Sequence, residues 1–156
     1  MAIKIDPITL TDVPIIEQLA YEYNRELDPQ TTRQEAVNRW ITSVAEATAE
    51  GRHFFWLARV EEQITGFVSF RLSTNPFTQE TSGFIKDLYI APQFRRRSYA
   101  EELTQAAFAE LSRQGASKIQ LDVLVNNDQG LAFWRKLGLA LHHYVLEMPV
   151  PNNAGG

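Results

Sequence analysis

Three consecutive arginines, Arg95–Arg97, stand just before a segment with helical character in the stretch APQFRRRSYAEELTQAA at positions 91–107. The start of a helix carries a partial positive charge and about four unpaired backbone N–H groups, so it repels cations and attracts anions. The small residues Ser98 and Ala100 would let a pyrophosphate group approach the backbone there. The stretch therefore indicates a phosphate-binding site, with an exposed, solvated charge cluster as the alternative.

The hydrophobic pattern predicts alternating strands and helices that would hold this segment in place. Thr11, followed by Asp12 and Pro14, is expected to cap the first helix, and Gly51 is typical of the residue after the second. The short EEQ segment between two apolar runs indicates a hairpin. Strands are expected at 2–5, 53–60, 63–72, 83–92, 117–125 and 139–150, and helices at 11–27, 33–50, 97–114 and 127–137.

The order of these elements predicts the class of fold. The strand–helix–strand order from 83 to 125 indicates one parallel strand pair joined by a right-handed crossover, and the other neighbouring strands are expected to be antiparallel. A chain of 156 residues can bury the core of one domain. We therefore expect a mixed α/β sheet in a single domain at 1–150. The tail PNNAGG at 151–156 has nothing to bury and is expected to fray.

Composition excludes several classes of protein and site. The chain has no cysteine, which excludes disulfides, thiolate catalysis and cysteine metal sites. Its net charge of −4 argues against a nucleic-acid binder, and no apolar run is long enough to span a membrane. His53, His142 and His143 show no metal-ligand spacing with acidic residues and are interpreted as structural or exposed, so no metal is expected. The expected location is the cytoplasm.

The segment LYIAPQFRRRSYAEEL resembles the acyl-CoA pyrophosphate motif of the GNAT superfamily of N-acetyltransferases. The family pattern is Gln or Arg, two free positions, Gly, one free position, then Gly or Ala. Arg95 fills the first place and Ala100 the last, whereas Ser98 stands where the middle glycine is usual. Ser98 adds a Cβ at a point of close approach, so a negative φ there would be tolerated and a positive φ would weaken CoA binding.

The segment NDQGLAFWRKLGL at 127–139 resembles the downstream part of the same family. There an asparagine precedes a helix with an aromatic pair, a lysine and a final glycine. An ordinary amphipathic helix with a glycine cap would explain these residues equally well. The order and spacing of the two segments make the resemblance specific over 83–140. The matching residues are Asn127, Phe133, Trp134, Lys136 and Gly138, while Gly130 replaces a usual alanine.

The resemblance implies a fold and an activity. The fold would be a mostly antiparallel central sheet with one splayed parallel strand pair, flanked by about four helices. The activity would be transfer of an acetyl group from acetyl-CoA to a primary amine of a small molecule, protein or peptide, by direct attack of the amine on the thioester. No nucleic acid or membrane partner is implied, and a homodimer is left open. The alternatives are a domain that binds acyl-CoA or a partner without turnover, and a reader of nucleic acid through FRRRSY.

The resemblance also implies roles for individual residues. Backbone N–H groups of the strand before the phosphate loop would bind the oxyanion, close to Tyr89. The groups that would bind CoA comprise that strand end, the phosphate loop and the downstream segment. They are Leu88, Tyr89, Ile90, Arg95, Arg96, Arg97, Ser98, Tyr99, Ala100, Asn127, Phe133, Trp134 and Lys136.

Departures from the family pattern fall on the proton-transfer groups. Trp134 stands where many members carry a tyrosine acid, and Lys86 where many carry a glutamate base. Asp87 lies next to Lys86, but alternation puts it on the opposite face unless a bulge intervenes, so it is either a proton relay or a surface carboxylate. Tyr144 on the last expected strand is another candidate acid, with a half-buried strand tyrosine as the alternative.

Acidic residues mark the end of the first expected helix and its loop, where family members often bind the acceptor. They could hold a cationic amine, and a solvated helix face is the alternative. These residues are Glu22, Glu26 and Asp28.

Overall fold

The computed structural model describes residues 3–31, 33–51 and 53–152. The chain forms two compact units, Met1–Leu121 and Asp122–Gly156. Among the described residues, the first unit holds five strands and three α-helices, and the second holds one helix, α4 (Asp128–Lys136). The single domain expected at 1–150 stays a prediction.

Both ends of the chain reach beyond the described residues. Ala2, the expected start of the first strand, and residues 153–156 of the expected frayed tail lie outside them. No helix in the described ranges is both long and apolar enough to cross a membrane.

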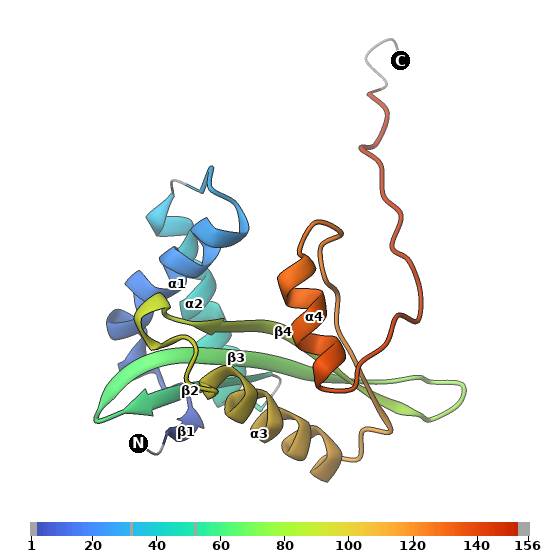
Figure 1. Cartoon of the computed structure of the whole chain (residues 1–156), viewed down its shortest axis with the longest axis horizontal. Helices are drawn as coiled ribbons and strands as arrows, with labels where there is room; N and C mark the ends of the chain where they lie inside the picture. The colour runs from blue at the N-terminus through green and yellow to red at the C-terminus, as the bar shows by residue number, and fades with distance from the viewer. Residues whose placement is uncertain (1–2, 32, 52, 153–156) are drawn as a thin grey trace. The chain divides into compact units, whose positions relative to one another are not determined.

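The first unit is built on a five-stranded sheet in the order β1-β2-β3-β4-β5 (Figure 1). The first four strands are antiparallel neighbours, whereas β4 and β5 are parallel. This arrangement confirms the expected mixed sheet with one parallel pair. The strands are β1 (Lys4–Pro7), β2 (Phe54–Val60), β3 (Gln63–Thr74), β4 (Thr81–Ile90) and β5 (Lys118–Gln120).

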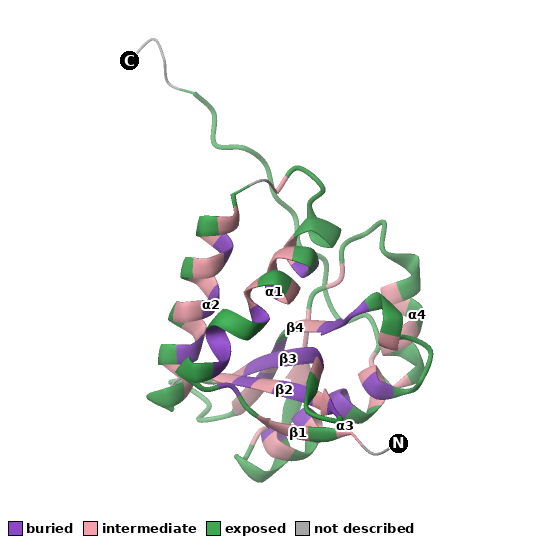
Figure 2. Ribbon diagram, turned by 90° about the vertical axis from the view of Figure 1, so that its left-hand side faces the viewer, coloured by how far each residue is buried: buried purple, intermediate pink, exposed green. Residues whose placement is uncertain are grey.

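Helices cover both faces of the sheet. Helices α1 (Val13–Leu27) and α2 (Gln34–Ala49) lie on one face, and α3 (Tyr99–Arg113) lies on the other and connects β4 to β5 (Figure 1). Strands β2 and β3 carry mostly buried residues because they lie between these layers (Figure 2). On the α3 side, a Cβ added to Gly83 would lie 2.8 Å from Leu111, so the missing side chain lets α3 approach β4 closely.

An aromatic cluster fixes α1 on the sheet. The Phe55 and Phe67 rings are stacked with centroids 4.9 Å apart. The Tyr23 ring packs against Phe67 at 5.2 Å and against Tyr89 at 5.4 Å. All four residues are buried, so their packing sets the position of the last two turns of α1 over β4.

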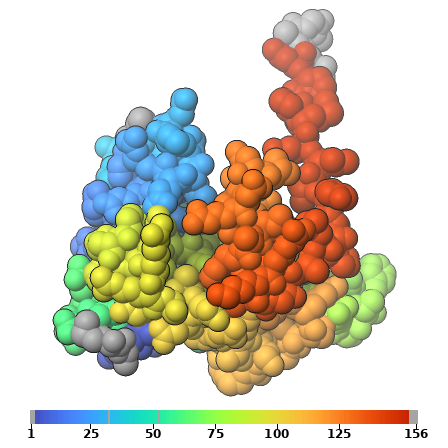
Figure 3. All heavy atoms as spheres, in the orientation of Figure 1, coloured from blue at the N-terminus to red at the C-terminus, as the bar shows by residue number. Residues whose placement is uncertain are grey.

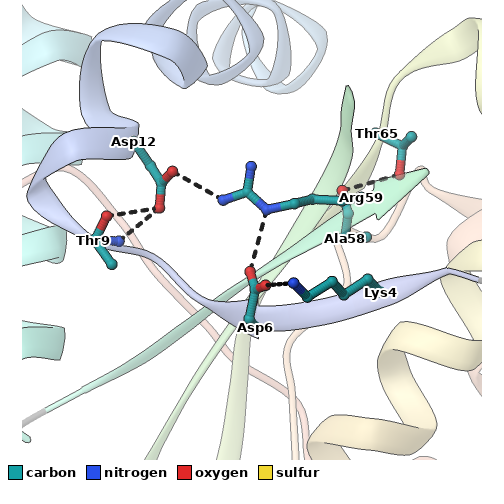
Figure 4. Close-up of polar contacts among 7 residues, drawn as sticks. All are labelled: Lys4, Asp6, Thr9, Asp12, Ala58, Arg59 and Thr65. Carbon is teal, nitrogen blue, oxygen red and sulfur yellow. Dashed lines mark hydrogen bonds and ion pairs between the residues drawn. The ribbon is translucent and has the colours of Figure 1, made fainter. Parts of the chain in front are cut away.

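The start of α1 is held by a polar network (Figure 4). Asp12 accepts hydrogen bonds from the backbone N–H of Thr9 at 2.9 Å and from its hydroxyl at 3.0 Å. Arg59 of β2 donates to Asp12 at 2.9 Å and to Asp6 at 3.3 Å. The expected cap at Thr11 was wrong, because the chain first makes a 3₁₀ turn, η1 (Leu10–Asp12), that starts after Thr9.

Two expected strands differ from the structure. The strand expected at 117–125 is only Lys118–Gln120, and the strand expected at 139–150 was wrong because those residues have no regular structure. Most apolar residues of the second segment are exposed, including Leu141, Leu146 and Met148. An alternating apolar pattern favours a strand, but the strand also needs a neighbour for its backbone N–H and C=O groups.

Candidate active site

A bulge in β4 turns Asp87 toward α1. Ser69 of β3 pairs with Asp87, but the next residue, Phe70, pairs with Ile85, so Lys86 is the extra residue on β4. Lys86 is exposed, whereas the side chain of Asp87 reaches Tyr23 of α1. Regular alternation would have put Asp87 on the opposite face from the site, and the bulge that the sequence left open reverses this.

Two hydroxyl groups hold the Asp87 carboxylate. Tyr23 donates to one oxygen at 2.6 Å, and Ser69 donates to the other at 2.5 Å. Burial, and then the neighbouring Asp87 charge, raise the pKa of Tyr23 far above its ordinary value, so its phenol stays a hydrogen-bond donor. Sequence reasoning missed Tyr23 and Ser69, because a tyrosine at helical spacing is typical of core. The one available signal was the polar Ser69 between the apolar residues Val68 and Phe70.

His53 lies close enough to Asp87 and its charged neighbours for them to affect its pKa. Burial lowers the pKa of His53, Asp87 raises it in part, and Lys86 and Arg71 lower it further. The net effect is a lowered pKa, which favours the neutral form of the imidazole. The sequence interpretation of His53 as structural or exposed did not foresee this neighbourhood.

Tyr89 near the end of β4 and Arg95 after η2 (Pro92–Phe94) lie in contact with each other. Tyr89 is 5% exposed, and its hydroxyl is buried without a hydrogen-bond partner among the described residues. Burial, and then the nearby Glu26 carboxylate, raise the pKa of Tyr89 well above its ordinary value. The Arg95 guanidinium lies over the Tyr89 ring, 5.4 Å from its centroid.

Arg95 binds Glu26 directly. Its Nη2 lies 2.9 and 2.7 Å from the two carboxylate oxygens of Glu26, and its Nε donates to the carbonyl of Ile90 at 2.8 Å. The space-filling view shows the segment around 90–98, in yellow, against the blue residues of α1 (Figure 3). Arg95 was expected to bind CoA and Glu26 the acceptor, and the structure brings these two side chains together.

The far end of β4 has an edge that β5 does not cover. Within the described residues of the first unit, β4 pairs with β5 only at Ser82–Phe84. The remaining residues of β4 pair with β3 on one side only. The parallel pair is therefore short, and the splay that the family resemblance implies stays a prediction.

Backbone directions along this edge follow from one hydrogen bond. Ala91 donates its N–H to a carbonyl of β3 at 2.8 Å. Because N–H directions alternate along a strand, the N–H of Tyr89 also faces β3, whereas those of Leu88 and Ile90 face the uncovered edge. The bond from Arg95 to the Ile90 carbonyl agrees with this direction. The backbone donors that can meet a ligand are therefore those of Leu88 and Ile90.

The segment between β4 and α3 has two left-handed residues. It makes a 3₁₀ turn, η2 (Pro92–Phe94), and then passes through Arg96 at φ +63° and Ser98 at φ +64°. Ser98 is the N-cap of α3, which therefore begins two residues later than the expected start at 97. Its positive φ is the unfavourable case for a serine, and the same strain at Arg96 had no signal in the sequence.

Charges at the start of α3 have both signs. Glu101 and Glu102 lie in its first turn. Arg96 and Arg97 make no ion pair with a described residue, and Arg97 lies 5.9 Å from the centroid of the Phe94 ring. Both guanidinium groups can therefore bind an anion without breaking an ion pair to any residue that the structure describes.

In the second unit, Asn127 caps α4. Its side-chain oxygen accepts the N–H of Gly130 at 2.9 Å, and a Cβ on Gly130 would lie 2.4 Å from its amide nitrogen. The close cap explains the glycine at a place where the family usually has alanine. Phe133 and Trp134 are in edge contact at 4.9 Å. Tyr144 is 84% exposed and lies in no strand.

The other acidic residues near the end of α1 have local partners. Glu22 accepts from Gln18 at 3.4 Å, and Asp28 accepts the backbone N–H of Gln30 at 3.0 Å.

Lys136 lies in the last turn of α4, where a cation is favourable.

Known structures share this fold. One is a possible acetyltransferase from Clostridium difficile 630, with a TM-score of 0.82 and 13% identity, covering 97% of this chain and 100% of that chain. Another is a ribosomal-protein-alanine N-acetyltransferase from Brucella melitensis biovar Abortus 2308, with a TM-score of 0.74 and 18% identity, covering 94% and 100%. At these identities the similarity concerns the fold.

A curated relative is similar in sequence over a shorter stretch. The chain is 32% identical over 68 residues to N-alpha-acetyltransferase 30 from Schizosaccharomyces pombe (strain 972 / ATCC 24843). The match spans 41% of this chain and 45% of that relative, so it covers less than half of either. The model of the acetyltransferase (GNAT) family matches residues 13–139, and the chain belongs to this family.

Proposed function

We propose that this protein is an N-acetyltransferase that moves an acetyl group from acetyl-CoA to a primary amine of a small molecule, a protein or a peptide. The observation that carries the proposal is the uncovered edge of β4. There the N–H groups of Leu88 and Ile90 lie between the Asp87 carboxylate and the phosphate-binding segment, in a chain of the acetyltransferase family.

The residues at the start of α3 fit a pyrophosphate group. Backbone N–H groups from Arg96 to Ala100, including that of Tyr99, would bind it, and the side chains of Arg96 and Arg97 have no ion pair to lose. Each charged hydrogen bond of this kind contributes about 1.5–3 kcal/mol. The positive φ of Ser98 places a Cβ where the family has glycine, so we expect weaker binding than with glycine.

Four residues of the second unit are proposed to bind the pantetheine arm of CoA, on the strength of the sequence resemblance. The Asn127 oxygen already accepts the N–H of Gly130, so its amide nitrogen is the group left to donate. The aromatic pair offers an apolar wall. The four residues are Asn127, Phe133, Trp134 and Lys136.

The chain supplies three things to the reaction. Acetyl-CoA, when bound, supplies the activated thioester that the neutral amine attacks, so that a C–N bond forms and the C–S bond breaks. The N–H groups of Leu88 and Ile90 donate to the developing oxyanion beside Tyr89. Asp87, held by Tyr23 and Ser69, takes the proton of the amine.

The leaving thiolate needs no acid from the protein. A free thiol has a pKa of about 8.5, so the thiolate is a good leaving group near neutral pH. Trp134 is a poor proton donor, and Tyr144 is exposed and outside any strand. Neither is needed in this scheme.

Carboxylates at the end of α1 are proposed to hold a cationic acceptor. Glu22 is the freest of them, because Glu26 is paired with Arg95 and Asp28 stabilises its own loop. The Brucella structure is named a ribosomal-protein-alanine N-acetyltransferase and the Schizosaccharomyces relative an N-alpha-acetyltransferase, which supports testing the α-amino groups of peptides as acceptors.

The second candidate is a domain that binds acyl-CoA without turnover. It is favoured by Trp134 and Lys86 at the places where many family members have their acid and base. Titration calorimetry with acetyl-CoA, followed by release of free thiol on a panel of peptides, polyamines and aminoglycosides, separates the two. Binding with turnover supports the enzyme, and binding without turnover supports the second candidate. A chain that does not bind acetyl-CoA would contradict both.

A further inference from the structure

The three consecutive arginines do not have the same surroundings. Arg95 is bound to Glu26, to the Ile90 carbonyl and to the face of the Tyr89 ring. Arg96 and Arg97 make no ion pair with any residue that the structure describes. The sequence places the three side chains side by side, but their contacts divide them into one inward and two outward groups.

Arg95 differs from Arg96 and Arg97 mainly in how its guanidinium is held, and less in the strength of its ion pair. The side chains of Arg95 and Glu26 are 42% and 46% exposed, and an ion pair with that exposure contributes little by Coulomb attraction alone. However, the guanidinium is fixed at three points: both Glu26 oxygens, the Ile90 carbonyl and the Tyr89 ring. A planar fork held in this way keeps a defined orientation, which a lysine could not reproduce.

The contacts of Arg95 lead to the acceptor side of the site. Glu26 and Tyr23 lie three residues apart on α1, and so on the same face of the helix. Glu26 binds Arg95, while Tyr23 donates to Asp87. The Tyr89 ring contacts both groups: its centroid lies 5.4 Å from that of the Tyr23 ring, and the Arg95 guanidinium lies over its face. Arg95 therefore holds the last turn of α1 in the position from which Tyr23 reaches Asp87.

A phosphate group would have to compete with these contacts. To bind an anion, Arg95 would give up the Glu26 carboxylate and leave it beside the buried Tyr89 hydroxyl. Arg96 and Arg97 lose no such bond. The free energy gained from a new phosphate contact is therefore largest at Arg96 and Arg97 and smallest at Arg95.

We propose that Arg95 is a positioning residue for the acceptor amine, acting through Glu26 and Tyr23, and that the phosphate-binding charge belongs to Arg96 and Arg97. This inference rests on the proposed acetyl transfer, because it concerns how the acceptor meets Asp87. The first arginine of the motif then acts on the acceptor side, whereas its two neighbours bind the phosphate.

The test compares single variants in two measurements. Arg95→Gln and Glu26→Gln each remove one side of the pair, Arg96→Gln removes an outward charge, and Arg113→Gln removes an exposed charge on α3 as a control. Calorimetry gives the Kd of acetyl-CoA, and steady-state rates at saturating acetyl-CoA give the KM of the acceptor. Thermal unfolding confirms that each variant is folded.

Arg95→Gln is expected to raise the acceptor KM about tenfold while the Kd of acetyl-CoA stays within about twofold. Glu26→Gln should reproduce this result, and the double variant should add little because the two residues act as one unit. Arg96→Gln should raise the Kd of acetyl-CoA and leave the acceptor KM unchanged. Arg113→Gln should change neither constant. Arg95→Lys should recover only part of the loss.

Two outcomes would overturn the inference. One is an Arg95→Gln variant whose Kd for acetyl-CoA rises as much as that of Arg96→Gln while the acceptor KM is unchanged. The other is full additivity of Arg95→Gln and Glu26→Gln. Failure of the proposed function looks different, because the wild-type chain itself would then show no turnover on the amine panel, and the acceptor role would fall with it.

Discussion

The phenolic oxygen of Tyr23 on α1 lies 2.6 Å from a carboxylate oxygen of Asp87 on β4, although 64 positions separate the two residues. Ser69 donates to the other oxygen of the same carboxylate at 2.5 Å. A carboxylate offers about four lone-pair sites, so Asp87 can still accept an N–H group of an amine. A bound acceptor would meet a carboxylate whose orientation is already fixed from two sides.

Replacing Asp87 by asparagine tests the proton transfer. We expect Asp87→Asn to lower turnover at pH 7 by a factor of about 10²–10⁴, because the amide cannot take a proton from the amine. The loss should shrink as the pH approaches the pKa of the acceptor amine, about 8 for an α-amino group and about 10.4 for a lysine, because the free amine then needs no base. A pH–rate profile measures both effects.

The control for this variant is Tyr23→Phe, which keeps the carboxylate and the aromatic packing. Losing one hydrogen bond of about 1 kcal/mol should lower turnover by up to about tenfold without changing the shape of the profile. An Asp87→Asn enzyme with the wild-type profile would mean that Asp87 has only a structural role.

Trp134 should act as an apolar wall and not as an acid. Trp134→Phe keeps an aromatic side chain next to Phe133, so turnover should fall by less than the factor of about 10²–10⁴ expected for loss of a general acid. Trp134→Ala, which removes the wall, should instead weaken acetyl-CoA binding. A thousandfold loss of turnover in Trp134→Phe with intact CoA affinity would contradict this role.

Glycine at the two left-handed positions should stabilise the protein. Arg96 and Ser98 have φ near +60°, where an L-residue is strained and glycine is not. Ser98→Gly is expected to raise the free energy of unfolding by about 0.5–1 kcal/mol, the strain relief being partly offset by the freer unfolded chain. Chemical denaturation measures this change, and Arg96→Gly should give a similar gain.

Ser98→Ala is the matched control, because it keeps the Cβ and should not stabilise. Acetyl-CoA affinity should be equal or higher in Ser98→Gly and lower in Ser98→Val, which crowds the phosphate. If serine, glycine and valine bound acetyl-CoA equally, the backbone at this position would not lie near the ligand.

Asp12 should make the stability of the fold depend on acid pH. Burial raises the pKa of Asp12, but the Thr9 N–H and Arg59 outweigh it, so the pKa in the folded state is below the ordinary value of 3.8. The stabilisation is therefore complete above the unfolded-state pKa and is lost as the pH falls through the lower folded-state value. Asp12→Asn should lower the free energy of unfolding by about 1–3 kcal/mol at pH 7.

As the pH falls below 3.8 and through the lower folded-state pKa, the same variant should differ less and less from the wild type, because the wild-type carboxyl then also becomes neutral. Glu46→Gln on the exposed side of α2 is the control and should leave the profile unchanged. Denaturation curves from pH 2 to 7 provide the comparison. A constant difference across that range would show that Asp12 stabilises by shape and not by charge.

Local signals in the sequence determined most of the helices and strands of the first unit. The hairpin of β2 and β3 and the helix start at Ser98 were predicted close to their observed bounds. Gly51 after α2 has φ +74°, as a helix-ending glycine should. These features depend on residues a few positions apart, so propensity and periodicity are enough to predict them.

Only the tertiary structure decided which side chains share a site. The bulge at Lys86 turns Asp87 toward Tyr23. Arg95 forms an ion pair with Glu26, a residue 69 positions away. Neither pairing has a local signal, because both depend on how α1 packs over β4. The expected strand at 139–150 was wrong for a related reason: an alternating pattern can prefer the extended backbone, but only a neighbouring strand can satisfy its hydrogen bonds.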